Sequence, residues 1–496
     1  MQPWEHSTPR RADLGSVAFR SIPSLIFGLT LFPNVAFFPF IPTNNQPVAA
    51  IAIMAFWLVF RRAKISLNRF TSPIVILIVL LTIYAVLTAV LRPAGAPRGA
   101  SAPGFITYFA SYREVGLTYF SYLIGPTIFL YLLYNFRKVS PRVVEAFLIF
   151  QGAICLLQTF GNGALRQLLA SGIGWMFIGF SSEPFAFGRG VAGTFPEPSH
   201  LGRYLIVLAA LLLYFRSSGQ ISRRRLVQFM SLIGALVIMN QSLTFLTLLL
   251  VWLSLQAVAA AFTGRFKQSA AIAVGLLLAG QIMVSLPATS RLSTLPVKMT
   301  ELSGRSTDFE VLDLQLLGGI RLIHMLVGYR AVTLFPAGQG LGSYLHNLPE
   351  TAGLLGINIY EAHFYRHVVS EVGRDGVITK PNGYAAQLTY DMGVFGLAAI
   401  ALLIFAILSE AAQSFRSREH IWSVPLLGVF LLMFYTTTSF PVPWIMLAFV
   451  NLYRLPALPE SGPAAGDAEA KNPWSASTLP ESWYRPPTLP GQEQGS

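Results

Sequence analysis

The chain has 496 residues, of which 53% are hydrophobic and only 11% are charged. Soluble globular proteins carry roughly 25% charged residues, so this composition excludes an ordinary soluble enzyme and a disordered protein, and the single cysteine, Cys155, excludes a disulfide scaffold. The net charge of +13 comes from basic residues placed between apolar runs, which is typical of a polytopic membrane protein and not of a nucleic-acid-binding protein.

Apolar runs of about membrane-spanning length recur along the chain. A transmembrane helix needs about 20 mostly apolar residues. The runs 226–262 and 421–453 are too long for one helix, and each has a polar or proline-containing middle, so we interpret each as a tight hairpin. The sequence therefore predicts an all-α polytopic membrane protein with about twelve transmembrane helices, at residues 22–41, 46–60, 72–92, 117–135, 143–160, 202–216, 226–240, 242–262, 269–287, 391–410, 421–438 and 439–453.

Short basic segments predict the orientation of these helices. Under the twelve-helix count all of them fall on one face, which the positive-inside rule makes cytoplasmic. The first apolar run lacks a clear cleavage site, so we retain it as a helix. Both termini are then cytoplasmic, with an N-terminal segment at 1–21, a membrane domain at 22–454 and a disordered tail rich in Pro, Ser and Gly at 455–496. The basic segments are marked by Arg10/Arg11/Arg20, Arg61/Arg62/Lys64, Arg137/Lys138, Arg223/Arg224/Arg225, Arg265/Lys267 and Arg416/Arg418.

Three larger segments, 93–116, 161–201 and 288–390, are expected on the opposite, outward face. The last of them is too long to be a plain connection. All three carry arginine, whose planar guanidinium makes bidentate bonds to phosphate. A phosphate-bearing ligand such as a lipid-linked pyrophosphate would suit this face.

Residues 313–335 show apolar residues at helical spacing, interrupted by Arg321, His324 and Arg330. Arg321 and His324 are three residues apart and share one helix face. One interpretation is an amphipathic helix resting at the membrane interface with its arginines reaching toward water. The other is a helix that presents these side chains to a ligand.

A glycine-rich run, Phe335–Tyr344, follows this segment. Gly338, Gly340 and Gly342 predict a tight turn at which the backbone comes close to another part of the molecule. No Gly-Lys-Ser/Thr follows, so the run is not a nucleotide-binding Walker loop.

The segment before residue 202 ends in a compact set of polar side chains. Arg189, Glu197, His200 and Arg203 combine acid, base and anion-binding groups at the mouth of a helix. The plainer alternative is a charged helix start, with Ser199 as N-cap and the glutamate paired with an arginine. The residues alone leave both interpretations open.

Three motifs resemble the O-antigen polymerase and ligase superfamily of bacterial polysaccharide assembly. The dominant periplasmic loop and the number of helices also agree with it. The first motif resembles a family stretch that precedes a transmembrane helix, and the third enters such a helix. The motifs are Arg189-Gly-Val-Ala-Gly-Thr-Phe-Pro-Glu-Pro-Ser-His200; Gly304-Arg-Ser with Arg321 and Pro336-Ala-Gly-Gln-Gly-Leu-Gly342; and Asn382-Gly-Tyr-Ala-Ala-Gln-Leu-Thr-Tyr-Asp-Met-Gly-Val-Phe-Gly396.

The resemblance implies a membrane glycosyltransferase similar to the GT-C type, working on the periplasmic face of the bacterial inner membrane without a metal or other cofactor. A polymerase moves the growing glycan from undecaprenyl diphosphate to a lipid-linked repeat unit. Its implied partners are the undecaprenyl-diphosphate-linked oligosaccharide, membrane lipid and a chain-length regulator, or co-polymerase. The products of such enzymes include O-antigen and exopolysaccharide.

One departure from the family separates polymerase from ligase. Ligases typically have a His-Asn pair that starts about eleven residues before a glycine matching Gly393, and that histidine is the expected base. Here this position is Asn382, followed by Gly383, while His346-Asn347 lies upstream at a different spacing. The missing histidine favours a polymerase.

Roles for individual residues follow from the resemblance and from charge. Arginines stabilise the departing diphosphate, and a carboxylate or imidazole takes the proton of the acceptor hydroxyl. Glu197 is the first candidate for the base and His200 the second. The expected catalytic residues are Arg189, Glu197, Arg321 and His200, the diphosphate-binding residues are Arg203 and Arg330, and the substrate loop contains Gly338, Gly340, Gly342, His346 and Asn382.

Two further questions stay open: the role of four aromatic residues, and whether the protein is an enzyme at all. Phe177, Tyr344, Tyr384 and Tyr390 are expected either to anchor the chain at the membrane interface or to stack on sugar rings. Besides a ligase, a lipid-linked sugar flippase or other transporter suits twelve helices, although the two halves show no convincing internal repeat. A non-catalytic partner of an export machine is the remaining alternative.

Overall fold

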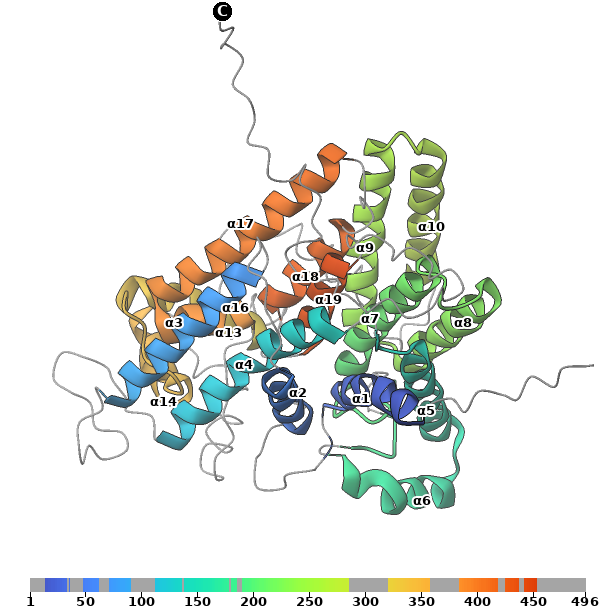
Figure 1. Ribbon diagram of the computed structural model, residues 1–496, viewed down its shortest axis with the longest axis horizontal. Helices are drawn as coiled ribbons and strands as arrows, with labels where there is room; N and C mark the ends of the chain where they lie inside the picture. The colour runs from blue at the N-terminus through green and yellow to red at the C-terminus, as the bar shows by residue number, and fades with distance from the viewer. Residues whose placement is uncertain are drawn as a thin grey trace, which may run out of the picture. The chain divides into compact units, whose positions relative to one another are not determined.

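The computed structural model describes residues 14–33, 35, 48–61, 71–90, 112–135, 138–177, 180–184, 190–284, 320–356, 383–417, 424–436 and 441–452. Within these residues every regular element is a helix, and an isolated antiparallel bridge pairs Val35 with Phe177. The fold is therefore all-α, as predicted (Figure 1). The predicted tail, 455–496, lies outside the described residues.

Each of the twelve predicted apolar segments coincides with or overlaps at least one helix. Tandem predictions such as 226–240 and 242–262 are separate helices, so the break predicted inside each long run is confirmed. The twelve helices are α1 (Leu14–Thr30), α2 (Val48–Phe60), α3 (Thr71–Val90), α4 (Tyr112–Asn135), α5 (Pro141–Phe160), α7 (Pro198–Ser217), α8 (Arg223–Asn240), α9 (Leu243–Phe262), α10 (Phe266–Val284), α17 (Val394–Ser417), α18 (Val424–Thr436) and α19 (Pro441–Leu452).

Five helical stretches are long and apolar enough to cross a membrane: α3, α4, α5, α7 and residues 245–262 of α9. Shorter apolar stretches occur in α2, α10, α17 and α18. These helices support the prediction that the chain is a membrane protein. The total of twelve crossings remains a prediction from the sequence.

Several predicted boundaries were wrong. α1 begins at Leu14, inside the predicted N-terminal segment 1–21, and α17 continues to Ser417, beyond the predicted end at 410. The first apolar helix was expected to run to residue 41, but α1 ends at Thr30 and a turn follows at Leu31–Pro33. Pro33 explains the end, because the residue before a proline is disfavoured in helical conformation. The helix predicted at 391–410 is broken at Gly393, which separates α16 (Tyr384–Met392) from α17.

The two predicted hairpins differ in their packing. α18 and α19 pack along each other, as a hairpin requires. Between α8 and α9 the chain turns sharply at Gln241, which has a positive φ of 47°, and Ser242 caps α9. Yet α8 and α9 do not pack along each other, because both pack against α7 instead.

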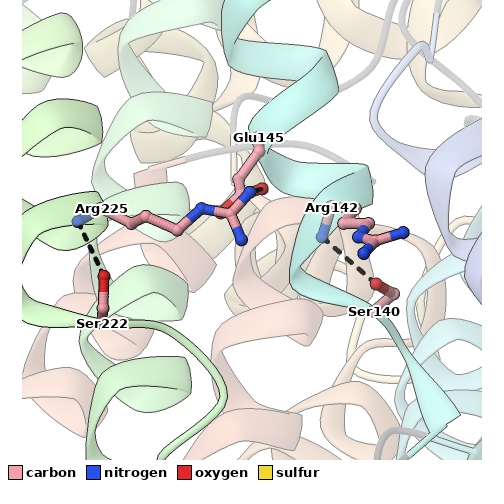
Figure 2. A network of polar contacts seen from close by, with 5 residues as sticks. All are labelled: Ser140, Arg142, Glu145, Ser222 and Arg225. Carbon is pink, nitrogen blue, oxygen red and sulfur yellow. Dashed lines mark hydrogen bonds and ion pairs between the residues drawn. The ribbon is translucent and has the colours of Figure 1, made fainter.

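Residues of the predicted basic segments make contacts at neighbouring helix ends. The Arg225 guanidinium reaches across to the buried Glu145 carboxylate at 2.8 Å, which places the start of α8 beside the start of α5 (Figure 2). The Trp57 indole, over which Arg61 stacks, donates to the last residue of α4, Asn135. Arg61 and Arg225 therefore lie at helix ends that adjoin α4 and α5, while the cytoplasmic placement of the basic segments stays a prediction.

The long segment 288–390 contains structure of its own. It holds α13 (Ile320–Leu334), α14 (Tyr344–Leu354) and most of α16. The predicted helix over 313–335 is confirmed for residues 320–334, while 313–319 lie outside the described residues. α13 packs against α16 and α14 and buries Val327 and Ala331, so its apolar side faces protein.

Close helix packing in the core depends on small residues. α4 packs against α19 at Gly125, where a Cβ would overlap the Trp444 indole. The Tyr384 ring packs 5.4 Å from the Trp444 ring and 5.2 Å from the Phe434 ring. This aromatic group joins α16 to α18 and α19 and fixes α16 against these two helices.

Candidate functional site

The first motif forms a loop, residues 190–197, held by two side-chain amides of α5. Gln158 accepts from the Gly193 N–H at 2.9 Å and donates to the Gly193 carbonyl at 2.9 Å and the Ser181 carbonyl at 2.6 Å. Gln151 accepts from the Thr194 N–H at 3.0 Å and donates to the Thr194 hydroxyl at 2.6 Å. Both glutamines are fully buried, so they supply the hydrogen bonds that this buried backbone cannot obtain from water.

A third amide holds the loop from the other side. Asn240, the last residue of α8, donates to the Val191 carbonyl at 2.6 Å and the Pro198 carbonyl at 3.0 Å. The Val191 N–H in turn donates to the Met239 carbonyl at 3.1 Å. The loop, defined here as the amide-clamped loop, is thus fixed between the C-terminal half of α5 and the end of α8.

The amide-clamped loop leads directly into α7. Glu197, and not Ser199, occupies the N-cap, and the Ser199 hydroxyl donates to the Glu197 carboxylate at 3.1 Å. The interpretation of Ser199 as N-cap was therefore wrong. Pro198 takes the first helical position, where its missing N–H costs nothing. Glu197 and His200 are half-buried at this helix start, whereas Arg203, one turn further, is buried.

The glycine-rich run forms the predicted tight turn. Gly338, Gly340 and Gly342 all have positive φ values, between 83° and 88°. The turn packs on the C-terminal end of α16: the Gln339 N–H donates to the Tyr390 carbonyl at 3.1 Å and the Gly340 N–H to the Asp391 carbonyl at 3.0 Å. The last carbonyls of a helix lack partners within it, so this turn, the glycine turn, caps α16.

The contact is reciprocal at Gly393. The Val394 N–H donates to the Pro336 carbonyl at 2.8 Å, and a Cβ at Gly393 would overlap the same carbonyl oxygen. The second and third motifs therefore interlock through their backbones.

A buried carboxylate lies where the two motifs meet. Asp391, on α16, accepts a 2.6 Å hydrogen bond from the Tyr122 hydroxyl of α4 and is 1% exposed. Three more tyrosines surround this pair within electrostatic reach of the carboxylate: Tyr84 of α3, Tyr344 of α14 and Tyr390 of α16. Burial, reinforced by the negative charge of Asp391, raises the pKa of Tyr344 and of Tyr390. We call these five residues the Asp391–tyrosine cluster.

The cluster continues into α13 through His324. The His324 Nδ1 atom lies 2.5 Å from the Tyr344 hydroxyl oxygen, and the Tyr344 ring meets the Tyr390 ring edge to face at 4.7 Å. Burial lowers the pKa of His324 from 6.5 to about 4, so the imidazole is neutral at pH 7. A buried neutral histidine in this position orients Tyr344.

A row of uncharged polar side chains completes the region. The Tyr390 hydroxyl lies 3.3 Å from the Thr351 hydroxyl, to which the Gln339 amide donates at 2.8 Å. Asn347 donates to the Gln339 carbonyl oxygen at 2.5 Å. These residues tie α14 to the glycine turn.

The structure brings together only part of the predicted site. Gly338, Gly340 and Gly342 lie at the Asp391–tyrosine cluster, and α13 places the backbone of Arg321 one turn before His324. Arg330 is exposed near the other end of α13. Arg203 belongs to α7, which does not pack against α13 and lies in a different part of the assembly (Figure 1).

Other predicted residues fall outside the described part of the chain. Arg189 and Asn382 lie outside it altogether. Arg321 and His346 belong to α13 and α14, but their side chains are not among those described.

The aromatic prediction was wrong in both of its forms. Phe177, Tyr344, Tyr384 and Tyr390 are buried, between 1% and 6% exposed. Each packs against other rings of the protein, such as Phe32 for Phe177 and Trp444 for Tyr384. They are core residues of the loop region and present no open face to a sugar.

Sequence reasoning missed the side chains that organise both loops. Gln151 and Gln158 are seven residues apart in an apolar run, which puts them on one helix face and was a usable signal. Asp391 was quoted within the third motif, but it was assigned to the start of an apolar helix and not to a site. An acid at the edge of an apolar run is itself a functional signal in a membrane protein.

Within the described residues, no three His, Cys, Asp or Glu side chains gather closely enough to hold a metal ion. Comparison of the chain with protein-family models and with curated proteins gives no match.

Proposed function

We propose that this protein is a polysaccharide polymerase of the O-antigen polymerase type. It transfers the growing glycan from undecaprenyl diphosphate to a lipid-linked repeat unit on the periplasmic face of the bacterial inner membrane. The chain crosses this membrane about twelve times, with both termini in the cytoplasm.

One observation supports the proposal most. The second and third motifs of the resemblance, separated in sequence by residues 343–381, fold against each other through the glycine turn, α16 and Gly393. They enclose a buried aspartate, Asp391, on a protein rich in apolar helices. An ionisable residue kept among such helices is costly and is a functional candidate by default.

The resemblance and the geometry give the residues their proposed roles. Arg321 is the second residue of α13 and precedes His324 by one turn. His324 contacts the Asp391–tyrosine cluster, so the cluster positions the end of α13 that carries this arginine. Arg189 precedes the amide-clamped loop. These two arginines neutralise the departing diphosphate, where each contributes about 3 kcal/mol if the pocket excludes water. Arg203 and Arg330 support them.

The transfer is a single displacement. The acceptor hydroxyl oxygen forms a bond to the anomeric carbon while the bond from that carbon to the diphosphate oxygen breaks. The electron pair leaves with undecaprenyl diphosphate, and the hydroxyl proton passes to a base. Glu197 is the proposed base because it is half-buried at the mouth of α7 and accepts a hydrogen bond from Ser199. His200 is the alternative.

The test is an analysis of lipid-linked and surface glycans in cells lacking the gene and complemented with variants. Arg189→Ala and Arg321→Ala should each leave single repeat units on lipid and no polymer. Arg142→Ala, which changes an exposed arginine at the basic end of α5, is the matched control and should restore wild-type polymer.

Other results would contradict the proposal. Full-length polymer that stays on its lipid carrier would identify an O-antigen ligase. Repeat units confined to the cytoplasmic leaflet would identify a flippase. Wild-type polymer from both arginine variants, at wild-type protein level, would show that Arg189 and Arg321 are not needed to bind the diphosphate.

A further inference from the structure

A short helix outside the predicted set, α6 (Gly163–Ile173), continues into the 3₁₀ turn η2 (Gly174–Met176). Leu165, Leu168, Leu169 and Ile173 recur at helical spacing and form one apolar face. Only Leu169 of this face is buried, whereas Leu168 is 66% exposed, and Trp175 in η2 is 73% exposed. The surface of α6 and η2 is therefore apolar and largely uncovered by the described chain.

The apolar surface of α6 and η2 lies next to the exposed apolar side of α5. α5 ends at Phe160, and only Gly161 and the N-cap Asn162 separate it from α6. Phe160 is 77% exposed and Leu156 is 50% exposed, as expected of a membrane helix that faces lipid. Figure 1 shows α6 across the end of α5 and apart from the other helices. Its apolar face thus begins where the membrane-facing surface of α5 ends.

The small number of charged residues also indicates that the surface of α6 and η2 faces lipid. Residues 163–177 contain one charged side chain, Arg166, whose guanidinium donates to the Thr159 carbonyl in the last turn of α5 at 3.4 Å. This arginine is directed toward the helix end and away from the exposed leucines. Tryptophan is enriched where a membrane meets water, because its ring is apolar and its N–H is polar. The Trp175 N–H donates to the Gly172 carbonyl at 3.0 Å, which leaves the ring exposed.

We propose that α6 and η2 lie in the interfacial layer of the membrane, with Leu165, Leu168 and Trp175 inserted among the lipids. The inserted surface is a lipid contact. It carries no acid or base for catalysis. This proposal rests on α5 crossing the membrane and is independent of the polymerase assignment.

The interfacial helix has a consequence for the amide-clamped loop. Its N-terminal end leaves α5 at Gly161, and the chain after η2 returns to α5 at Ser181, whose carbonyl accepts from Gln158. The same Gln158 side chain holds Gly193. Anchoring α6 in the interface therefore fixes the depth of the loop that carries Glu197, so a lipid-linked substrate would meet it at the membrane surface.

The depth of α6 can be measured with the full-length protein in vesicles of phosphatidylethanolamine and phosphatidylglycerol. Leu168→Cys is labelled with an environment-sensitive fluorophore, and Gln167→Cys, exposed on the opposite face, is the matched control. Wild-type protein serves as the blank because its one cysteine, Cys155, is fully buried. We expect lipids that carry a nitroxide near the headgroup to quench the label at 168 several-fold more than the label at 167. Aqueous iodide should give the reverse order.

Three results would overturn the proposal. Equal iodide quenching at both positions would place α6 in water. Stronger quenching at 168 by a nitroxide near the bilayer centre would mean a buried or spanning segment. A blue-shifted label at 168 that neither quencher reaches would mean that protein, either a partner or a second copy of this chain, covers the face. None of these readouts depends on polymer synthesis, so failure here leaves the proposed function untouched.

Discussion

The two loop regions of this protein achieve the same end by different means. The amide-clamped loop is fixed by side chains, because Gln151, Gln158 and Asn240 supply hydrogen bonds to its backbone. The glycine turn is fixed by its own backbone, which donates directly to the carbonyls at the end of α16. The first arrangement needs particular residues outside the loop. The second needs the absence of side chains within it.

Because of this difference, the two loops should respond to different kinds of substitution. Losing an amide leaves a buried backbone group without its partner, a cost of about 1–3 kcal/mol. Adding a side chain at an interlocked glycine forces two backbones apart. The ionisable groups differ as well: Glu197 and His200 at the first loop are half-buried, while Asp391 and His324 at the second are buried. The ionisable groups of the first region can therefore exchange protons with a substrate or with water, whereas those of the second are shielded from water.

The largest effect is expected for Gly393→Ala. Its Cβ would overlap the Pro336 carbonyl oxygen, and its φ is +57°. Overpacking costs about 1–3 kcal/mol or more, and the left-handed backbone adds about 1 kcal/mol, so little folded protein should remain on detergent extraction. Gly275→Ala in α10 has open space around it and should be neutral or stabilising. Equal thermal unfolding of the two variants would refute the interlock.

Asp391→Asn should separate function from folding. The amide keeps the size of the carboxylate and can still accept from Tyr122. It also removes a negative charge buried at the C-terminal end of a helix, where the dipole disfavours it by about 0.3–1 kcal/mol. We expect thermal stability to be unchanged or higher and surface polymer to fall at least tenfold. If polymer stays normal, the aspartate serves packing alone.

Gln158→Ala tests the clamped loop. It removes three hydrogen bonds, to Gly193 and Ser181, and should lower the free energy of unfolding by about 3 kcal/mol. Gln167→Ala changes an exposed glutamine on α6 and should have no measurable effect. The measurement is thermal unfolding in detergent, with polymer length on gels as a second readout. Matching results for both glutamines would show that side-chain amides do not hold the loop.

The smallest effect concerns acid stability. Because the pKa of His324 falls from 6.5 to about 4 on folding, the unfolded chain binds a proton between these pH values that the folded chain does not. Folding stability is thus lost as pH falls below 6.5, by about 2 kcal/mol between pH 6.5 and pH 5. His324→Gln removes this titration, so the drop in unfolding temperature over this range should be smaller in the variant. An identical drop would mean that the imidazole is not buried.

Periodicity and turn chemistry predicted much of this architecture. Apolar runs located twelve helices, and three closely spaced glycines predicted a backbone contact that the glycine turn makes with α16. What the sequence did not reveal is the identity of long-range partners. Nothing in the residues near Gly193 points to Gln158, and nothing near Tyr122 points to Asp391, because such pairs are set by helix packing. Helices α6, α14 and α16 were missed because each is too short to show a clear helical period of apolar residues.

The glycine turn also bears on how this protein evolves. Every replacement of a glycine by another amino acid introduces a side chain, and at Gly338 that side chain would collide with the backbone of Asp391. Gly340 and Gly342 share the same left-handed backbone. Related chains can therefore vary their exposed loops freely while this turn stays constant. Among distant descendants, the spacing of these three glycines should outlast most of the surrounding sequence.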